Sequence, residues 1–126
     1  MTAPELRVGN IVEYKSKALF VESINKDGIN LIGSDDFFIY PVYEFGELHP
    51  IKISKQWLLS FGFRGYDGHY FQINDIIEIY MDRFTFEMWI GVNSNFSIHH
   101  VKYIHELQNL YYALTGKELV LADSLL

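Results

Sequence analysis

The sequence predicts an α+β fold: a small, mostly antiparallel, curled sheet with one short helix and one longer C-terminal helix packed on the sheet. Three patterns support this prediction. Short runs rich in β-branched and aromatic residues alternate with turn dipeptides, a central apolar stretch carries helix caps, and residues 101–119 form a long amphipathic pattern. The chain has 126 residues and no internal repeat, so we expect a single domain over 1–126.

The first third of the chain predicts short strands joined by tight turns. Gly9–Asn10 and Asp27–Gly28 are dipeptides that favour the positive φ of such turns, and apolar residues flank the second one as in a β-hairpin. Three closely spaced strands indicate a small curled sheet that is SH3-like in outline. Pro41 and Pro50 interrupt the next segment, which is therefore expected to be a loop or an edge strand.

The middle of the chain predicts a short helix over 55–61. Ser54 has the side chain of an N-cap residue, and Gly62 is suited to the left-handed conformation that ends a helix. One face of this helix would be apolar and hold Trp57, Leu58 and Phe61.

Residues 70–92 alternate in polarity and predict further strands. If Asp82–Arg83 forms a two-residue turn, Met81 lies opposite Phe84 and Glu78 lies opposite Glu87. This register gives one face that is wholly apolar and therefore core: Ile77, Ile79, Met81, Phe84, Phe86, Met88 and Ile90.

The stretch "VKYIHELQNLYYALTGKEL" predicts one strong helix that ends at Gly116. Its apolar stripe is wide enough to cover a sheet, so we interpret the helix as scaffold and not as a ligand site. The stripe holds Ile104, Leu107, Tyr111 and Leu114, broadened by Tyr103 and Leu110. The polar residues Lys102, Glu106, Gln108 and Asn109 fall mostly outside it.

Three segments resemble a family of small uncharacterised proteins from Bacteroidetes genomes, prophages and phages. They are "LRVGNIVEY", "PIKISKQWLLSFGF" and "KYIHELQNLYYALTGKEL". Members of that family show L-R-I-G-N, P-I-x-L-T and K-Y-V-H-x-L-Q-N-L-Y-x-A-L-T-G-x-E-L in the same order. The departures are mild: Val8 and Ile104 are aliphatic exchanges, and Ser54 replaces Thr. The resemblance implies a phage or prophage accessory protein, and it supplies no catalytic residues to transfer.

Composition narrows the function classes. The net charge is −6 and no basic stripe is visible, so we expect no direct binding of nucleic acid. Cysteine is absent, which rules out disulfides and thiolate chemistry. No signal peptide or membrane-spanning segment is evident, and the expected location is the bacterial host cytoplasm. The 10 Phe and 9 Tyr residues exceed what one core needs by pattern, which favours a homodimer interface.

The sequence predicts no metal site, no cofactor and no catalytic residue. His99 and His100 point to opposite faces if they lie on a strand, and His105 lacks the i, i+4 spacing of a helical metal pair. No phosphate-binding or nucleophile motif is present. Binding is therefore favoured over covalent chemistry, with an enzyme that acts on a nucleotide as the third interpretation.

Two groups of residues are the candidate binding sites. In the predicted strand pair, Glu78, Tyr80, Glu87 and Trp89 share the face away from the core. The opposed carboxylates are either solvated or matched by a cationic or hydrogen-bonding partner. In the turn-rich stretch 64–70, Arg64, Tyr66, His69 and Tyr70 either decorate a turn or hold an anionic or aromatic ligand.

The leading functional hypothesis is an accessory protein that binds a host protein factor without covalent chemistry. The alternative is sequestration of a small nucleotide signal, with the pocket at a subunit interface of an oligomer.

Overall fold

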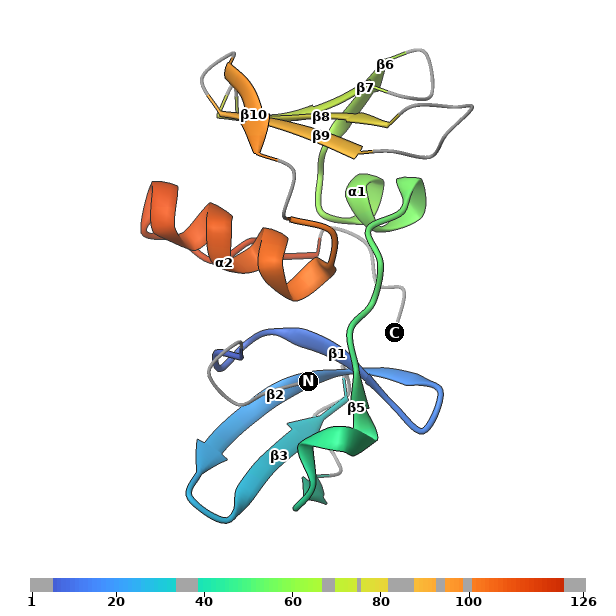
Figure 1. Ribbon diagram of the computed structural model, residues 1–126, viewed down its shortest axis with the longest axis vertical. Helices are drawn as coiled ribbons and strands as arrows, with labels where there is room; N and C mark the ends of the chain where they lie inside the picture. The colour runs from blue at the N-terminus through green and yellow to red at the C-terminus, as the bar shows by residue number, and fades with distance from the viewer. Residues whose placement is uncertain are drawn as a thin grey trace. The chain divides into compact units, whose positions relative to one another are not determined.

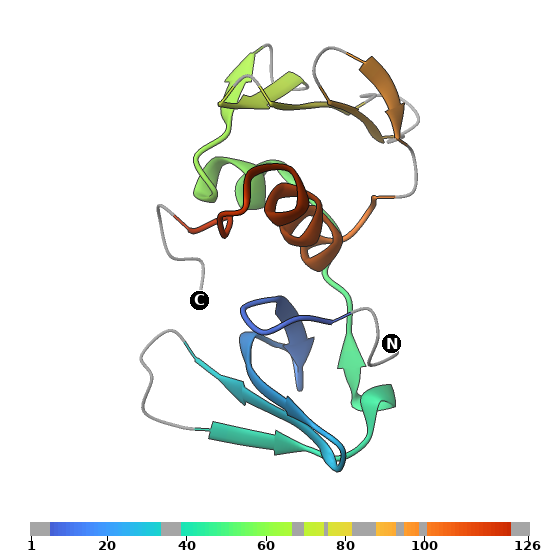
Figure 2. The same ribbon diagram turned by 90° about the vertical axis from the view of Figure 1, so that its left-hand side faces the viewer.

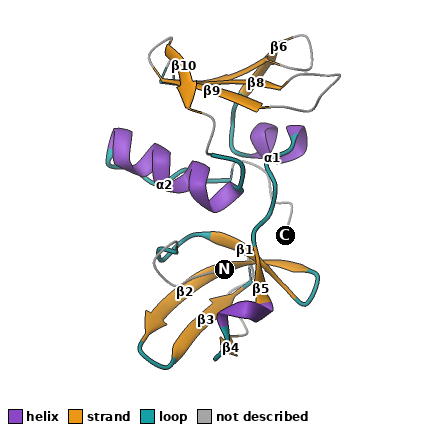
Figure 3. Cartoon of the chain, in the orientation of Figure 1, coloured by secondary structure: helices purple, strands orange, loops and turns teal. Residues whose placement is uncertain are grey.

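The computed structural model describes residues 6–33, 39–66, 70–74, 76–81, 88–92, 95–98 and 101–121. The chain divides into two compact units: the first comprises Met1–Lys52 and Tyr103–Glu118, and the second Ile53–Lys102 and Leu119–Leu125. In its described part, each unit contains a five-stranded antiparallel sheet and one α-helix (Figure 3). The α+β class is confirmed. The expected single curled sheet is wrong, because the strands divide into two sheets that do not curl; the single domain over 1–126 stays a prediction.

The first sheet has the strand order β4-β3-β2-β1-β5, with every neighbouring pair antiparallel (Figure 1). The hairpin predicted here is confirmed, but its turn lies one residue earlier than Asp27–Gly28: Asn25 pairs with Gly28, so Lys26 and Asp27 are the turn residues and Asp27 lacks the predicted positive φ. A Cβ atom on Gly28 would lie 2.2 Å from the carbonyl oxygen of Val42, so only glycine fits beside β4. The strands are β1 (Ile11–Tyr14), β2 (Lys17–Asn25), β3 (Gly28–Ile32), β4 (Ile39–Val42) and β5 (Leu48–His49), with the 3₁₀ turn η2 (Phe45–Glu47) before β5.

The proline-containing segment forms the edge strand β4, one of the two forms expected for it. Pro41 lies in β4 opposite Asn30 of β3, and β4 is the last strand of its sheet. Proline is tolerated there because an edge strand has one side on which no ladder hydrogen bond is needed. One core cluster of this unit is formed by Leu6, Val12, Leu19, Val21, Ile29, Leu31, Val42 and Leu48.

The predicted long helix is α2 (Ile104–Thr115). The Glu106 carboxylate accepts a hydrogen bond from the Tyr103 backbone N–H at 3.1 Å, and Gly116 takes the predicted left-handed conformation with φ 72°. Its buried side chains are Ile104, His105, Leu107, Gln108 and Tyr111. Leu114, predicted to be buried, is 42% exposed, whereas Gln108, predicted to lie outside the stripe, is 2% exposed.

The second unit begins with the predicted short helix, α1 (Lys55–Ser60). The Ser54 hydroxyl accepts from the Trp57 N–H at 3.4 Å. At the other end, Gly62 N–H donates to the Leu59 carbonyl and Phe63 N–H to the Leu58 carbonyl, both at 3.0 Å. This pair of bonds is the Schellman motif, and Phe63 and Leu58 are both buried beside it.

The second sheet has the strand order β10-β9-β8-β7-β6, again antiparallel throughout. Its strands are β6 (Arg64–Tyr66), β7 (Tyr70–Ile73), β8 (Ile77–Met81), β9 (Met88–Val92) and β10 (Asn95–Ile98). One face is core, with Phe71, Ile73, Ile77, Ile79 and Ile90 all buried.

The predicted pairing of β8 with β9 is wrong by four residues. Met81 pairs with Met88 instead of Phe84, and Glu78 pairs with Gly91 instead of Glu87. The reason is the length of the connection: residues 82–87 lie outside the described residues, and the strands do not meet at a two-residue turn after Met81. A shift by an even number keeps every side chain on its face, so Ile77, Ile79 and Ile90 still share the core face.

Candidate functional site

Four aromatic residues stand in register across four neighbouring strands of the second sheet. Tyr66 of β6 pairs with Tyr70 of β7, Tyr70 pairs with Tyr80 of β8, and Tyr80 pairs with Trp89 of β9. Directly paired residues of antiparallel strands share a face. We call these four residues the aromatic row; it lies on the face opposite the buried isoleucines of β8.

A second row runs beside it on the same face. Arg64 pairs with Gln72, Gln72 with Glu78, and Glu78 with Gly91. We call Arg64, Gln72 and Glu78 the polar row. The predicted opposition of Glu78 and Glu87 does not occur, since a glycine without a side chain stands opposite Glu78. The two explanations for that carboxylate pair, solvation or a cationic or hydrogen-bonding partner, therefore no longer apply.

This outer face is accessible where the structure describes its side chains. Tyr80 is 38% exposed, Arg64 is exposed, and Tyr70, Gln72 and Glu78 are half-buried. On the same strand, Ile77 and Ile79 are fully buried. The contrast identifies the outer face as a surface and the inner face as core. Tyr66 and Trp89 belong to the face by backbone register alone.

The structure brings together six of the eight residues that the sequence singled out. Arg64, Tyr66 and Tyr70, predicted in a turn-rich stretch, fall on one continuous face with Glu78, Tyr80 and Trp89, which were predicted in a strand pair. His69 and Glu87 lie outside the described residues. Sequence reasoning missed Gln72 and the joining role of Tyr70, although the alternation of Tyr70, Phe71, Gln72 and Ile73 carried the signal of a half-buried strand.

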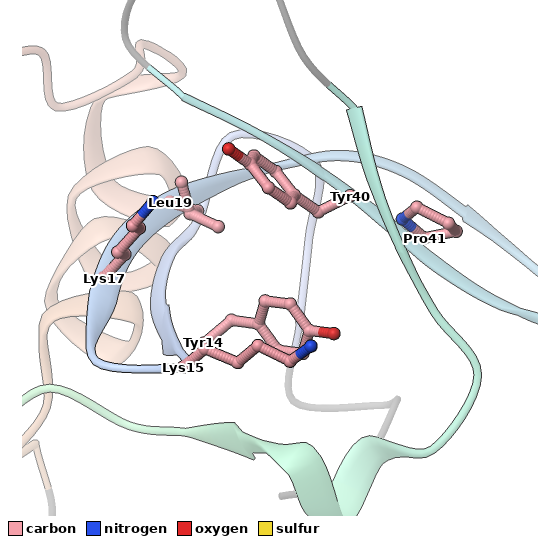
Figure 4. A pocket seen from close by; sticks show the side chains of 6 residues that line it. All are labelled: Tyr14, Lys15, Lys17, Leu19, Tyr40 and Pro41. Atoms are coloured by element: carbon pink, nitrogen blue, oxygen red, sulfur yellow. The ribbon is translucent and has the colours of Figure 1, made fainter.

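A pocket of about 160 Å³ lies in the first unit, between the β1–β2 turn and β4 (Figure 4). Tyr14 and Tyr40 lie on opposite sides of it in that view, and both pack against the core of the first sheet. Its lining residues are Tyr14, Lys15, Lys17, Leu19, Tyr40 and Pro41. The sequence predicted no ligand-binding role for the residues of this pocket, because its lining comes from two segments that are separated along the chain.

The polar side chains of α2 hold the fold together. Gln108 Nε2 donates to the Gly9 carbonyl at 3.0 Å, and Gln108 Oε1 accepts from the Ile11 N–H at 2.8 Å. Asn109 Oδ1 accepts from Asn10 Nδ2 at 2.8 Å and from Arg7 Nε at 3.1 Å. Two views show α2 beside the segment that leads into β1 (Figures 1 and 2). These contacts support the interpretation of the helix as scaffold.

Among the described residues, no group of three or more His, Asp or Glu side chains is placed to hold a metal ion. His99 and His100 lie outside that part of the chain. No helix in the described ranges has the length and apolar character needed to cross a membrane. Comparison with known proteins finds no matching family model, no matching curated protein and no matching solved structure.

Proposed function

We propose that this chain is a non-catalytic binding protein that engages a host protein factor through the outer face of the second sheet. The aromatic row carries the proposal, because Tyr and Trp offer large flat contact areas with few rotatable bonds and are enriched in binding hot spots. Arg64 and Glu78 of the polar row would supply directed hydrogen bonds at the rim. His69 and Glu87 stay in the proposed site on sequence grounds alone.

A protein partner fits this face better than a nucleic acid. A sheet face with a row of aromatic residues also suits single-stranded nucleic acid, but such sites pair the aromatic residues with cations that follow the phosphates. In the two rows Arg64 is accompanied by Glu78, and the whole chain carries a net charge of −6. The mixed polar row therefore favours a protein surface as the partner.

The biological setting of the proposal rests on the three sequence segments that resemble proteins of Bacteroidetes, their prophages and their phages. We place the chain among phage or prophage accessory proteins that act in the cytoplasm of the bacterial host. A homodimer remains part of the proposal, since an aromatic sheet face is also suited to self-association.

For the first unit we propose an SH3-like strand order. Four strands follow one another as a meander, η2 comes next, and β5 returns to pair with β1 through Glu13–His49 and Tyr14–Leu48. This order supports a compact binding module, although the fold alone does not assign a function.

The partner proposal is tested by affinity capture from a host lysate with the wild-type chain and two variants. Tyr80→Ala changes the aromatic row, and Tyr43→Ala removes a tyrosine of the first unit that is 72% exposed. We expect Tyr80→Ala to lose the captured protein and Tyr43→Ala to retain it. A protein retained equally by both variants would rule out this face. Light scattering of the same variants shows whether the face joins two copies instead.

The alternative function is sequestration of a small nucleotide. The pocket of the first unit favours it, although it lies within one chain and not at the subunit interface where the sequence placed such a pocket. Incubation with a panel of cyclic nucleotides, followed by chromatography, separates the remaining possibilities. Nucleotide recovered intact with the protein supports sequestration, and altered nucleotide supports an enzyme.

A further inference from the structure

We propose that the pocket between the β1–β2 turn and β4 binds a single flat ring that carries an anionic group, of the size of a pyrimidine mononucleotide. The inference deepens the alternative nucleotide function. It does not depend on the partner face, because the pocket belongs to the first sheet and the partner face to the second.

The volume of the pocket selects the size of the ring. An apolar cavity of roughly 150 Å³ is known to hold one benzene molecule. The present pocket has about 160 Å³ and is half open to solvent, so it can seat one six-membered ring, and part of a fused purine would remain outside its walls. A larger ligand would place the remainder of its atoms outside, at the rim.

The walls of the pocket suit a flat apolar group. Tyr14 and Tyr40 approach it from β1 and β4 on opposite sides (Figure 4), and Leu19, which is 5% exposed, belongs to the core cluster beneath them. Both tyrosines are half-buried against that cluster. Side chains held by packing on two sides keep their positions, so the pocket exists before a ligand arrives. Nucleobases stack readily on such aromatic walls.

The rim of the pocket is cationic. Lys15 and Lys17 are exposed lining residues, and the Lys15 Nζ atom lies 5.3 Å from the centroid of the Tyr14 ring. None of the six lining residues is acidic, although the chain as a whole has a net charge of −6. Figure 4 shows the two ammonium groups at different edges of the hollow, and either one complements a phosphate attached to a ring that enters there.

The backbone of the β1–β2 turn provides independent support. Lys15 and Ser16 have φ values of 49° and 65°, in the left-handed region, and they connect the paired residues Tyr14 and Lys17. A two-residue turn of this kind favours Asn-Gly, because these residues adopt positive φ with little strain. Non-glycine residues kept in such a conformation cluster at functional sites, so the conformation of Lys15 and Ser16 agrees with a binding role for this turn.

Calorimetry with uridine monophosphate tests the proposal on the full chain. We expect uridine monophosphate to bind. Uridine and inorganic phosphate should each bind with an affinity lower by at least about tenfold, because each lacks half of the contacts. Adenosine monophosphate should also bind more weakly, since its ring exceeds the pocket. If phosphate alone binds as well as the nucleotide, or adenosine monophosphate binds equally well, the assigned ligand class is wrong.

Three variants assign the binding to the pocket. Lys15→Ala combined with Lys17→Ala should lower the affinity for uridine monophosphate by about tenfold or more. Lys26→Ala, in the turn that follows the other end of β2, is the matched control and should leave the affinity unchanged. The double variant Lys15→Asn, Ser16→Gly should fold with a higher Tm and bind less tightly, which separates loss of binding from loss of folding. No detectable binding by the wild-type chain, or equal affinity in all variants, overturns the proposal. These results do not test the proposal that a host protein binds the face that holds Tyr80, because that face belongs to the second sheet.

Discussion

Gln108 of α2 closes a hydrogen-bonded ring on the backbone around Asn10, and it does so from the other end of the chain. Its Nε2 donates to the Gly9 carbonyl at 3.0 Å, and its Oε1 accepts from the Ile11 N–H at 2.8 Å. The side-chain amide thereby serves as a neighbouring strand would, satisfying a donor and an acceptor at the start of β1. Because all of these groups are buried or partly buried, water does not readily replace the amide.

Replacement of Gln108 by Leu should therefore lower the free energy of unfolding by about 2–3 kcal/mol. The change keeps the approximate volume of the side chain but leaves a carbonyl and an N–H without partners. Urea denaturation measures the loss. Gln56→Leu on the exposed side of α1 is the matched control and should change stability by no more than about 0.5 kcal/mol. Equal effects of the two substitutions would contradict the bridging role of Gln108.

Arg7 should contribute more to stability than its ion pair with Glu118 suggests. The Arg7 side chain is 29% exposed and that of Glu118 is 43% exposed, and such a pair is worth only about 0–1 kcal/mol. Arg7 also donates to Asn109 at 3.1 Å and lies over the Tyr112 ring at 4.3 Å. Glu118→Gln should therefore cost under about 1 kcal/mol and Arg7→Ala about 2 kcal/mol. Thermal unfolding at low and at high salt checks both values, and a salt-sensitive loss of similar size in both variants would show that the ion pair dominates.

The elements that were predicted correctly depend on short-range chemistry. Ser54, Gly62 and Gly116 act on backbone groups within one helical turn, so their roles can be predicted from the sequence. The same holds for the β2–β3 hairpin, which was predicted at the right place although its turn residues are Lys26 and Asp27 instead of Asp27 and Gly28.

The missed features depend on partners that are distant along the chain. Gln108 was placed outside the apolar stripe because its hydrogen-bond partners lie about 100 positions earlier in the sequence. The division into two sheets has the same origin, since local patterns do not specify which strands meet. The register of β8 and β9 was wrong because the length of their connection is not encoded by a single turn dipeptide such as Asp82–Arg83. The candidate site was nevertheless found in large part, because an even shift preserves the faces on which Tyr80 and Glu78 lie.

Gly62 offers a test of conformational strain without any steric change. A Cβ atom at Gly62 or at Gly46 would have no neighbour within 4 Å, yet Gly62 has a φ of 90° at the end of α1. Gly62→Ala should destabilise the chain by about 1 kcal/mol, because alanine adopts the left-handed region at a cost. Gly46→Ala, with no such φ, should be neutral or slightly stabilising. Circular dichroism during thermal unfolding distinguishes the two, and a neutral Gly62→Ala would count against the Schellman cap.

The β1–β2 turn should accept a stabilising substitution. Lys15→Asn with Ser16→Gly relieves two non-glycine residues at positive φ, and the expected gain is about 1–2 kcal/mol. Asp27→Gly in the β2–β3 turn is the control, because Asp27 has no positive φ and glycine only adds freedom to the unfolded chain there. The first change should raise Tm and the second should lower it. A fall of Tm in both would mean that the Lys15 and Ser16 side chains stabilise the turn.

Neighbouring residues of β8 test which face of the second sheet is core. Ile79 is fully buried and Tyr80 is 38% exposed, and they point to opposite faces of the strand. Ile79→Ala removes buried methyl groups and should cost about 2–5 kcal/mol. Tyr80→Ala removes a side chain that stands in register with Tyr70 and Trp89 and should cost only about 1 kcal/mol. Urea denaturation gives both values. Losses of equal size would mean that the aromatic row is covered within the chain, and the face would then have no area left to offer a partner.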